Sequence, residues 1–200
     1  MSSSAIAPVS RALPSAATPP AASAKARFWD RIAPKYAADP IADLAGYEAT
    51  LQRVQGLLSP QHDVLEIGCG TGSTALRLAP FTRSLLATDV SSQMIAIAHQ
   101  RLAAQPSPSL RFAVADAEAL APGPEVYDAV LAFNVLHLMT DLDDALRQLA
   151  KVLRPGGLLI SKTACVAEMN PLIPYLAVPL MRAIGTVSYT HLTLPTTPYV

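Results

Sequence analysis

The sequence predicts an α/β fold, a Rossmann-like three-layer α/β/α sandwich with a mainly parallel sheet. Short apolar segments alternate with helical ones between residues 63 and 162, which is the order of parallel strands joined by crossover helices. The apolar segments are nearly continuous, as in strands that are buried on both faces. Two hundred residues are enough for one such domain with its own core and too few for two of ordinary size.

Two helices are expected ahead of the sheet, one beginning at Phe28 and one over residues 47–58 that Ser59 and Pro60 end. Strands are then expected over residues 63–67, 84–88, 110–115, 129–133 and 158–162, and helices over residues 73–79, 93–103 and 142–152. Ligands of such sheets bind beyond the carboxyl ends of the strands. The residues that follow each strand are therefore the candidates for a site.

The first expected strand runs directly into a glycine-rich loop. Residues 64–72 read Val-Leu-Glu-Ile-Gly-Cys-Gly-Thr-Gly, which places glycines at positions 68, 70 and 72. Glycine lets the backbone turn sharply and approach a ligand with no Cβ in the way. The helix that follows at Ser73 would turn its N-terminal amides toward that ligand. Gly68, Gly70 and Gly72 are therefore predicted to bind a nucleotide-like cofactor.

Two aspartates end the next two strands. Asp89 follows the second strand, where a carboxylate can accept both hydroxyls of a ribose. The alternative role for Asp89 is a helix N-cap, but Ser91 and Ser92 lie nearer the helix and would serve better. Asp116 ends the third strand and either accepts a hydrogen bond from an adenine amino group or caps its own loop.

The charge of the loop distinguishes between nucleotide cofactors. A dinucleotide fingerprint has Gly or Ala at the sixth position from Gly68, where this chain has Ser73. Glu66, directly before the loop, would repel a pyrophosphate. S-adenosylmethionine carries an ammonium and a sulfonium group and no phosphate, so Glu66 would attract it. The sequence therefore predicts S-adenosylmethionine as the cofactor, and an NAD(P)-dependent oxidoreductase is the weaker alternative.

These motifs together resemble the class I S-adenosylmethionine-dependent methyltransferases, over about residues 27–165. The run from Glu66 to Gly72 is similar to the first motif of that family. The resemblance implies that Asp89 binds the ribose and that Asp116 and Ala117 contact the adenine. Residues 133–137 resemble the end of the family's fourth strand, and residues 153–160 its turn into the fifth. The most similar group is the quinone-biosynthesis and small-molecule methyltransferases, in which Tyr36 would touch the methionine end of the cofactor.

Several residues near these motifs have an open role. Met94 is by default a core residue of its helix and is also placed to pack on the adenine ring. Asn134 either bonds the cofactor or caps its loop. If the acceptor is a hydroxyl, His137 is the candidate general base, and its alternative role is to shape the pocket. His62 and His99 are expected to be surface residues.

The predicted function is methyl transfer from S-adenosylmethionine to a small, apolar acceptor by in-line displacement. Such a reaction needs alignment and exclusion of water more than a catalytic triad. An apolar stretch with three prolines, residues 169–181, resembles a cap over an active site, with plain core packing as the alternative. An inactive cofactor-binding fragment is the other alternative.

Composition argues against other classes of protein. Fifteen Lys and Arg balance fifteen Asp and Glu, so the chain lacks the basic patch of a nucleic-acid binder. Cys69 and Cys165 lie in no zinc or disulfide pattern, and a reducing cytoplasm fits them. No apolar run reaches the length of a membrane span, and no signal peptide starts the chain. The expected partner is a small-molecule methyl acceptor, with no metal and no integral membrane association.

The two ends of the chain differ from the domain between them. Residues 1–24 are mostly Ala, Ser and Pro and are expected to be a disordered leader, with a transit peptide as the alternative. The methyltransferase domain is expected over residues 25–185. Residues 186–200 resemble translated sequencing-adapter sequence, which predicts that a native C-terminal part with strands six and seven of the family is missing, unless the tail supplies an irregular strand. The fifth strand would then be an exposed apolar edge.

Overall fold

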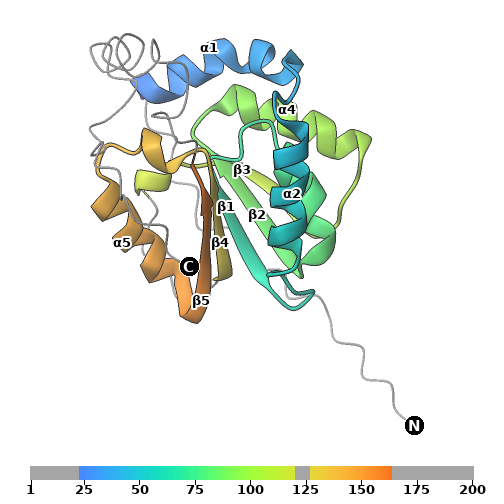
Figure 1. Ribbon diagram of the computed structural model, residues 1–200. Coiled ribbons are helices and arrows are strands. Elements are labelled where there is room, and N and C mark those ends of the chain that lie inside the picture. The colour runs from blue at the N-terminus through green and yellow to red at the C-terminus, as the bar shows by residue number, and fades with distance from the viewer. Residues whose placement is uncertain (1–22, 120–126, 164–200) are drawn as a thin grey trace.

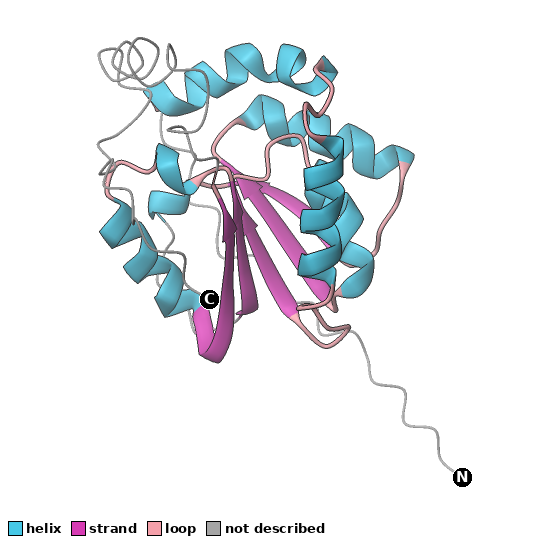
Figure 2. Cartoon of the chain, viewed as in Figure 1, coloured by secondary structure: helices cyan, strands magenta, loops and turns pink. Residues whose placement is uncertain are grey.

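The computed structural model describes residues 23–119 and 127–163. Within these residues, five strands form one sheet in the spatial order β3-β2-β1-β4-β5, and every neighbouring pair is parallel. Helices lie on both sides of this sheet (Figure 1, Figure 2). The predicted α/β sandwich with a parallel sheet is thereby confirmed.

The strands are β1 (Asp63–Ile67), β2 (Ser84–Asp89), β3 (Leu110–Val114), β4 (Tyr127–Phe133) and β5 (Leu153–Lys162). The helices are α1 (Ala24–Ala38), α2 (Leu44–Gln55), α3 (Ser73–Leu78), α4 (Ser92–Ala104) and α5 (Leu142–Val152). Short 3-10 turns lie at η1 (Ala79–Phe81), η2 (Ala117–Ala119) and η3 (Leu136–Leu138). The expected positions of β1 and α5 agree with the structure, and most of the other ends differ by one to three residues.

Alternate residues of β1 face opposite sides of the sheet. Val64 belongs to a core cluster that includes side chains of α2, α3 and α4, whereas Leu65 and Ile67 belong to a second cluster with side chains of α5. All residues of β1 are buried, as a central strand covered on both faces must be. The glycine-rich loop therefore leaves the sheet from its most enclosed strand.

Helix α1 crosses above the sheet, at the end where the glycine-rich loop leaves β1 (Figure 1). It begins at Ala24, because the Ser23 hydroxyl accepts a hydrogen bond from the amide of Ala26 at 3.1 Å. The expected start of this helix at Phe28 was therefore wrong, because the helix begins four residues earlier. Residues 1–22 lie outside the described part of the chain.

Strand β5 begins five residues earlier than expected, at Leu153 rather than at residue 158. Leu153 pairs with Tyr127 and Leu158 pairs with Ala129, so the residues between them bulge out of the register. Gly156, with φ +78°, lies in this bulge. Within the described residues β5 is an edge of the sheet, with Leu158 and Leu159 exposed. The expected cap, the tail and the missing strands fall in residues 164–200, outside the described part.

Candidate active site

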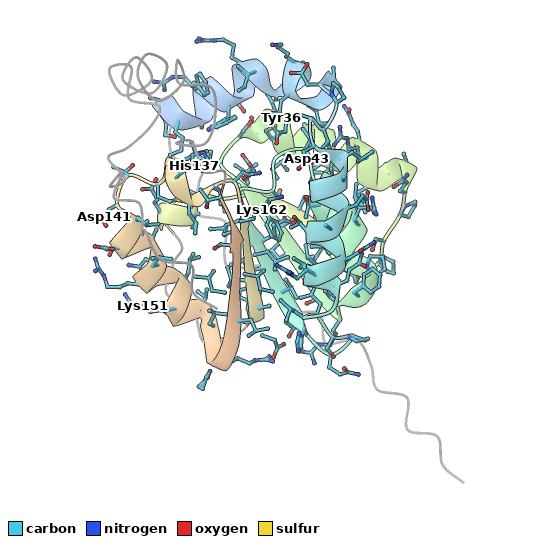
Figure 3. All side chains as sticks on the ribbon, viewed as in Figure 1. Tyr36, Asp43, His137, Asp141, Lys151 and Lys162 are labelled. Atoms are coloured by element: carbon cyan, nitrogen blue, oxygen red, sulfur yellow. The ribbon has the colours of Figure 1, made fainter. Side chains whose placement is uncertain are left out.

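A cavity of about 640 Å³ lies between α1 and the carboxyl ends of β1, β2, β3 and β4. Every residue proposed from the sequence as a site residue lines it except Gly72; these are Tyr36, Glu66, Gly68, Gly70, Asp89, Met94, Asp116, Ala117, Asn134 and His137. Figure 3 shows Tyr36 and His137 at the same end of the sheet, on different elements. The topology thus gathers side chains that are up to a hundred residues apart in the sequence.

Glycine is required at Gly68 and at Gly72 for different structural reasons. Gly68 has φ +62°, and a Cβ there would lie 2.4 Å from the Val135 side chain, so only glycine fits beside the β4 loop. Gly72 has φ +77°, and a Cβ there would lie 2.5 Å from the Phe112 ring of β3. Gly72 does not line the cavity, and its missing side chain lets the loop lie against Phe112 of β3 and Ala98 of α4. The expectation that Gly72 binds the cofactor stays a prediction.

Glu66, the last residue but one of β1, is the most unusual group in the cavity wall. It is only 2% exposed, and its Oε2 atom has no hydrogen-bond partner among the described residues. Burial, with a further contribution from the Asp89 carboxylate, raises the pKa of Glu66 to about 8. A buried carboxylate that lacks a partner is costly unless a cation or a proton joins it. The wall therefore offers an acceptor for a positively charged ligand group.

Asp89 ends β2 and holds the glycine-rich loop in place. Its Oδ2 accepts from the amide of Gly70 and its Oδ1 from the amide of Ser91, both at 2.9 Å. Burial is the main reason that the pKa of Asp89 is raised. Ser91 caps α4 by accepting from the amide of Met94 at 3.1 Å, so Asp89 is not the helix cap. Each carboxylate oxygen retains a lone pair that a ligand hydroxyl can use.

Residues after β3 form another side of the cavity. Asp116 accepts from the amide of Glu118 at 3.0 Å, so the loop-capping role considered for it is present. That bond uses Oδ1, and Oδ2 remains for a ligand. Ala117 and Met94 also line the cavity. Met94 is buried, so it packs in the core of the domain and also forms part of the cavity wall.

Two residues after β4 close the other side. Asn134 has φ +53°, an uncommon conformation that asparagine tolerates. Its backbone amide donates to the carbonyl of Lys162 at 2.7 Å. His137 lies in η3, half-buried, and its Nδ1 has no partner among the described residues. Burial lowers the pKa of His137, which favours the neutral imidazole that a general base requires.

The other histidines differ in exposure. His99 is exposed on α4 and meets the Phe112 ring edge to face at 5.8 Å, as expected of a surface residue. His62 is only partly exposed, and its Nδ1 is buried without a partner among the described residues. The expectation that His62 is a plain surface residue was therefore wrong. It lies at the opposite end of β1 from the cavity, which it does not line.

Helix α1 supplies residues that the sequence alone did not reveal. Asp30 accepts hydrogen bonds from the Ser91 hydroxyl at 2.6 Å and the Gln93 amide at 3.0 Å, so it holds α1 on the start of α4. Lys25, which lines the cavity, forms an ion pair with Glu118 of η2. Asp30 and its partners are more than 60 residues apart, and no local pattern in the sequence signals such a contact.

Tyr36 and Arg101 complete the wall beside the glycine-rich loop. The Tyr36 ring lies 3.6 Å from the position that a Cβ of Gly70 would take. Partial burial and the nearby Asp89 carboxylate raise the pKa of Tyr36, which keeps it a phenol and hydrogen-bond donor. Arg101 donates to Thr71 in the loop, a contact that sequence reasoning missed because the two residues belong to different elements.

The described ranges hold neither a metal site nor a membrane-spanning helix. No group of three or more His, Cys, Asp or Glu residues there is arranged to hold a metal ion. No helix in those ranges combines the length and the apolar character needed to cross a membrane. The Cys69 thiol is buried, and burial raises its pKa well above the usual value, so it is an unreactive wall residue.

Most residues that line this cavity belong to a segment that is similar to known proteins. Residues 64–157 match the model of a methyltransferase-domain family. The non-reducing polyketide synthase dpmpA of Macrophomina phaseolina is 35% identical over 147 residues, which are 66% of this chain and 6% of that protein. The methyltransferase GfsG of Streptomyces halstedii is 35% identical over 124 residues, 60% of this chain and 44% of that protein. The chain thus spans less than half the length of these relatives.

A solved structure gives the same picture of the fold. The CcbJ methyltransferase from Streptomyces caelestis is 28% identical to this chain with a TM-score of 0.58. The likeness covers 68% of this chain and 57% of that chain. The matched family residues include Glu66, Asp89 and His137, whereas Tyr36 and the rest of α1 precede them. The part of the cavity wall that α1 forms therefore lies outside the residues that match the family.

Proposed function

We propose that this chain is a class I, S-adenosylmethionine-dependent methyltransferase that methylates a small, apolar acceptor, since residues 64–157 match the model of a methyltransferase-domain family. The cavity under α1 holds the cofactor, and the acceptor enters beside it. A cavity of about 640 Å³ lies within the range of ordinary small-molecule sites. When bound, S-adenosylmethionine supplies a methyl group already activated by its sulfonium.

The buried carboxylate of Glu66 is the observation that carries this proposal. It needs a cationic partner, and the ammonium group of S-adenosylmethionine is one. A pyrophosphate-containing dinucleotide would instead bring negative charge to a wall that already holds the carboxylates of Asp89 and Asp116, and would offer Glu66 no cation. The sign of the charge thus favours S-adenosylmethionine over NAD(P).

The remaining wall residues have compatible roles. Asp89 accepts the ribose hydroxyls with the lone pairs that the amides of Gly70 and Ser91 leave unused. The free oxygen of Asp116 faces the adenine amino group, with Ala117 and Met94 against the ring. Tyr36, as a phenol, donates to the methionine end.

His137 is the candidate base for an acceptor that must lose a proton. Its lowered pKa keeps the imidazole neutral at pH 7, so Nδ1 or Nε2 can take a hydroxyl proton. An acceptor without such a proton would need His137 only for its shape. Either role would place the acceptor next to His137, which Figure 3 shows at the same end of the sheet as Tyr36.

The acceptor side of the cavity is largely apolar. Side chains lining it include Trp29, Ile41, Tyr47, Leu138 and Met139. Such a wall favours an aromatic or lipid-like acceptor over a charged one. A polyketide-type acceptor fits this chemistry, and dpmpA is by name a polyketide synthase.

Calorimetric titration of the chain with S-adenosylmethionine and, separately, with NADH tests the proposal. We expect micromolar binding of S-adenosylmethionine and none of NADH. Asp89→Asn should weaken binding by about tenfold or more, since a hydrogen bond to a charged group contributes roughly 1.5–3 kcal/mol. Asp143→Asn, on the exposed first turn of α5, is the control and should bind like the wild type. Binding of NADH but not of S-adenosylmethionine by a folded chain would refute the proposal.

A further inference from the structure

Arg101 lies on α4 in the cavity wall, and its guanidinium contacts three separate segments. Nη1 donates to the Thr71 hydroxyl at 2.6 Å and to the Thr71 carbonyl at 3.2 Å. It also donates to the Ser73 hydroxyl at the start of α3. Nη2 donates to the carbonyl of Ala37, in the last turn of α1, at 3.2 Å. One side chain thus joins the glycine-rich loop, α3 and α1.

The segments joined by Arg101 carry the two halves of the site. Thr71 and Ser73 flank Gly72 in the loop that follows Glu66, the cofactor side of the cavity. Ala37 lies in the last turn of α1, the helix that carries Trp29 of the apolar acceptor wall and Tyr36, whose ring lies against Gly70. The Arg101 guanidinium is therefore a direct link between the glycine-rich loop and the last turn of α1.

The contacts of Arg101 suit arginine and no other residue type. No described carboxylate pairs with it, and its donors go to hydroxyl and carbonyl oxygens. A planar guanidinium can reach oxygens on opposite sides at once, whereas the ammonium of lysine is a single point. The residue therefore acts as a bridge between segments rather than as one half of an ion pair.

The other polar anchors of α1 contact different parts of the molecule. Asp30 bonds the first residues of α4, and Lys25 pairs with Glu118 after β3. Neither of these two bonds the glycine-rich loop. Only two α1 residues, Ala26 and Ala33, are fully buried, so apolar packing holds this helix weakly and its polar anchors matter.

We propose that Arg101 is a positioning residue that couples the two halves of the site, so that ordering of the glycine-rich loop by cofactor also orders the Tyr36 end of α1. The coupling rests on the proposed function, because that function assigns the loop to the cofactor and Trp29 of α1 to the acceptor side. Cofactor binding would then prepare the acceptor pocket by tightening α1 over it.

Hydrogen exchange of the full chain, measured by mass spectrometry with and without saturating S-adenosylhomocysteine, tests the coupling. The variants are Arg101→Lys and Arg101→Met, and Arg53→Lys on the exposed side of α2 is the matched control. Without ligand, exchange should become about tenfold faster at residues 35–38 and at residues 70–74 in both Arg101 variants, since each lost hydrogen bond to a charged donor contributes roughly 1.5–3 kcal/mol. Exchange in α5 should stay as in the wild type.

With S-adenosylhomocysteine, the wild type and Arg53→Lys should gain protection in both the loop and α1. Arg101→Lys should gain it in the loop alone, a separation that a merely destabilised fold would not produce. If Arg101→Met does not fold, Arg101→Lys decides the outcome. Unchanged exchange of α1 in unliganded Arg101→Lys would overturn the proposal, as would equal ligand-induced protection of α1 in all variants. Failure of the wild type to bind ligand would instead refute the proposed function, while the unliganded comparison still decides whether Arg101 joins the loop to α1.

Discussion

Glu66 is a residue that stabilises the unliganded fold less than a neutral side chain would. Its pKa is raised to about 8, chiefly by burial and further by Asp89. An acid whose folded pKa lies above its unfolded value destabilises the fold as pH rises from the unfolded pKa to the folded one. For Glu66 that window runs from its ordinary value of 4.5 to about 8. The residue is therefore kept at a cost, which is typical of binding sites.

Glu66→Gln should make the unliganded chain more stable at pH 7 and weaken its binding of S-adenosylmethionine. The expected gain in the free energy of unfolding is about 3 kcal/mol at pH 7, since pH 7 lies about 2.5 units above the ordinary pKa of 4.5 and one unit corresponds to about 1.4 kcal/mol. The gain should shrink as the pH falls to 4.5, where the unfolded carboxyl is half protonated, and vanish below it. Denaturant titrations at both pH values measure it. A variant less stable than the wild type at pH 7 would contradict this account of Glu66.

The sequence identified most of the candidate site at the scale of single residues. Glu66 and Asp89 could be found because each lies at the carboxyl end of a strand. In a parallel sheet that position places the side chain at the edge where ligands bind. Asp30 and Arg101 could not be found, because each acts on a segment distant in the sequence and has no motif around it. Gly72 was found as part of a motif, but only the three-dimensional approach of Phe112 shows what its missing side chain permits.

At the scale of elements, strand positions were predicted better than helix ends. Apolar runs mark the buried strands, whereas the ends of α1 and α2 depend on caps. Asp43 caps α2 by accepting from the Gly46 amide at 2.8 Å, which starts the helix three residues before the expected position. The early start of β5 could not be foreseen, because its Arg-Pro-Gly-Gly sequence is typical of a turn and the structure accommodates it as a bulge.

Gly72→Ala should be much more destabilising than Gly156→Ala, although both glycines have nearly the same positive φ. Both variants pay about 1–2 kcal/mol for a left-handed backbone. Only Gly72→Ala also forces a Cβ to within 2.5 Å of Phe112, whereas nothing lies within 4 Å of a Cβ at Gly156. We expect a further loss of about 1–3 kcal/mol from overpacking. Chemical denaturation of both variants gives the difference, and equal losses would show that Gly72 does not lie against the Phe112 ring as described.

At the scale of the whole molecule, the order of strands and helices was enough to predict the layered fold and the end of the sheet that binds ligand. Parallel strands must all present their carboxyl ends at one edge, so scattered motifs converge there without any knowledge of contacts. The position of α1 over that edge was not predictable, because it depends on polar contacts between distant segments, among them those of Asp30, Arg101 and Lys25. The expectations of a leader, a cap and missing strands concern residues outside the described part and stay predictions.

The central claim is that the buried Glu66 carboxylate accepts the ammonium group of S-adenosylmethionine. Below its pKa of about 8, Glu66 is mostly protonated in the empty site and must release that proton when the cation binds. Calorimetry at pH 7 in buffers of different ionisation enthalpy counts the protons released on binding, in the wild type and in Glu66→Gln. The account predicts that the wild type releases about 0.9 proton more than the variant. Equal proton release by two chains that both bind the cofactor would contradict it.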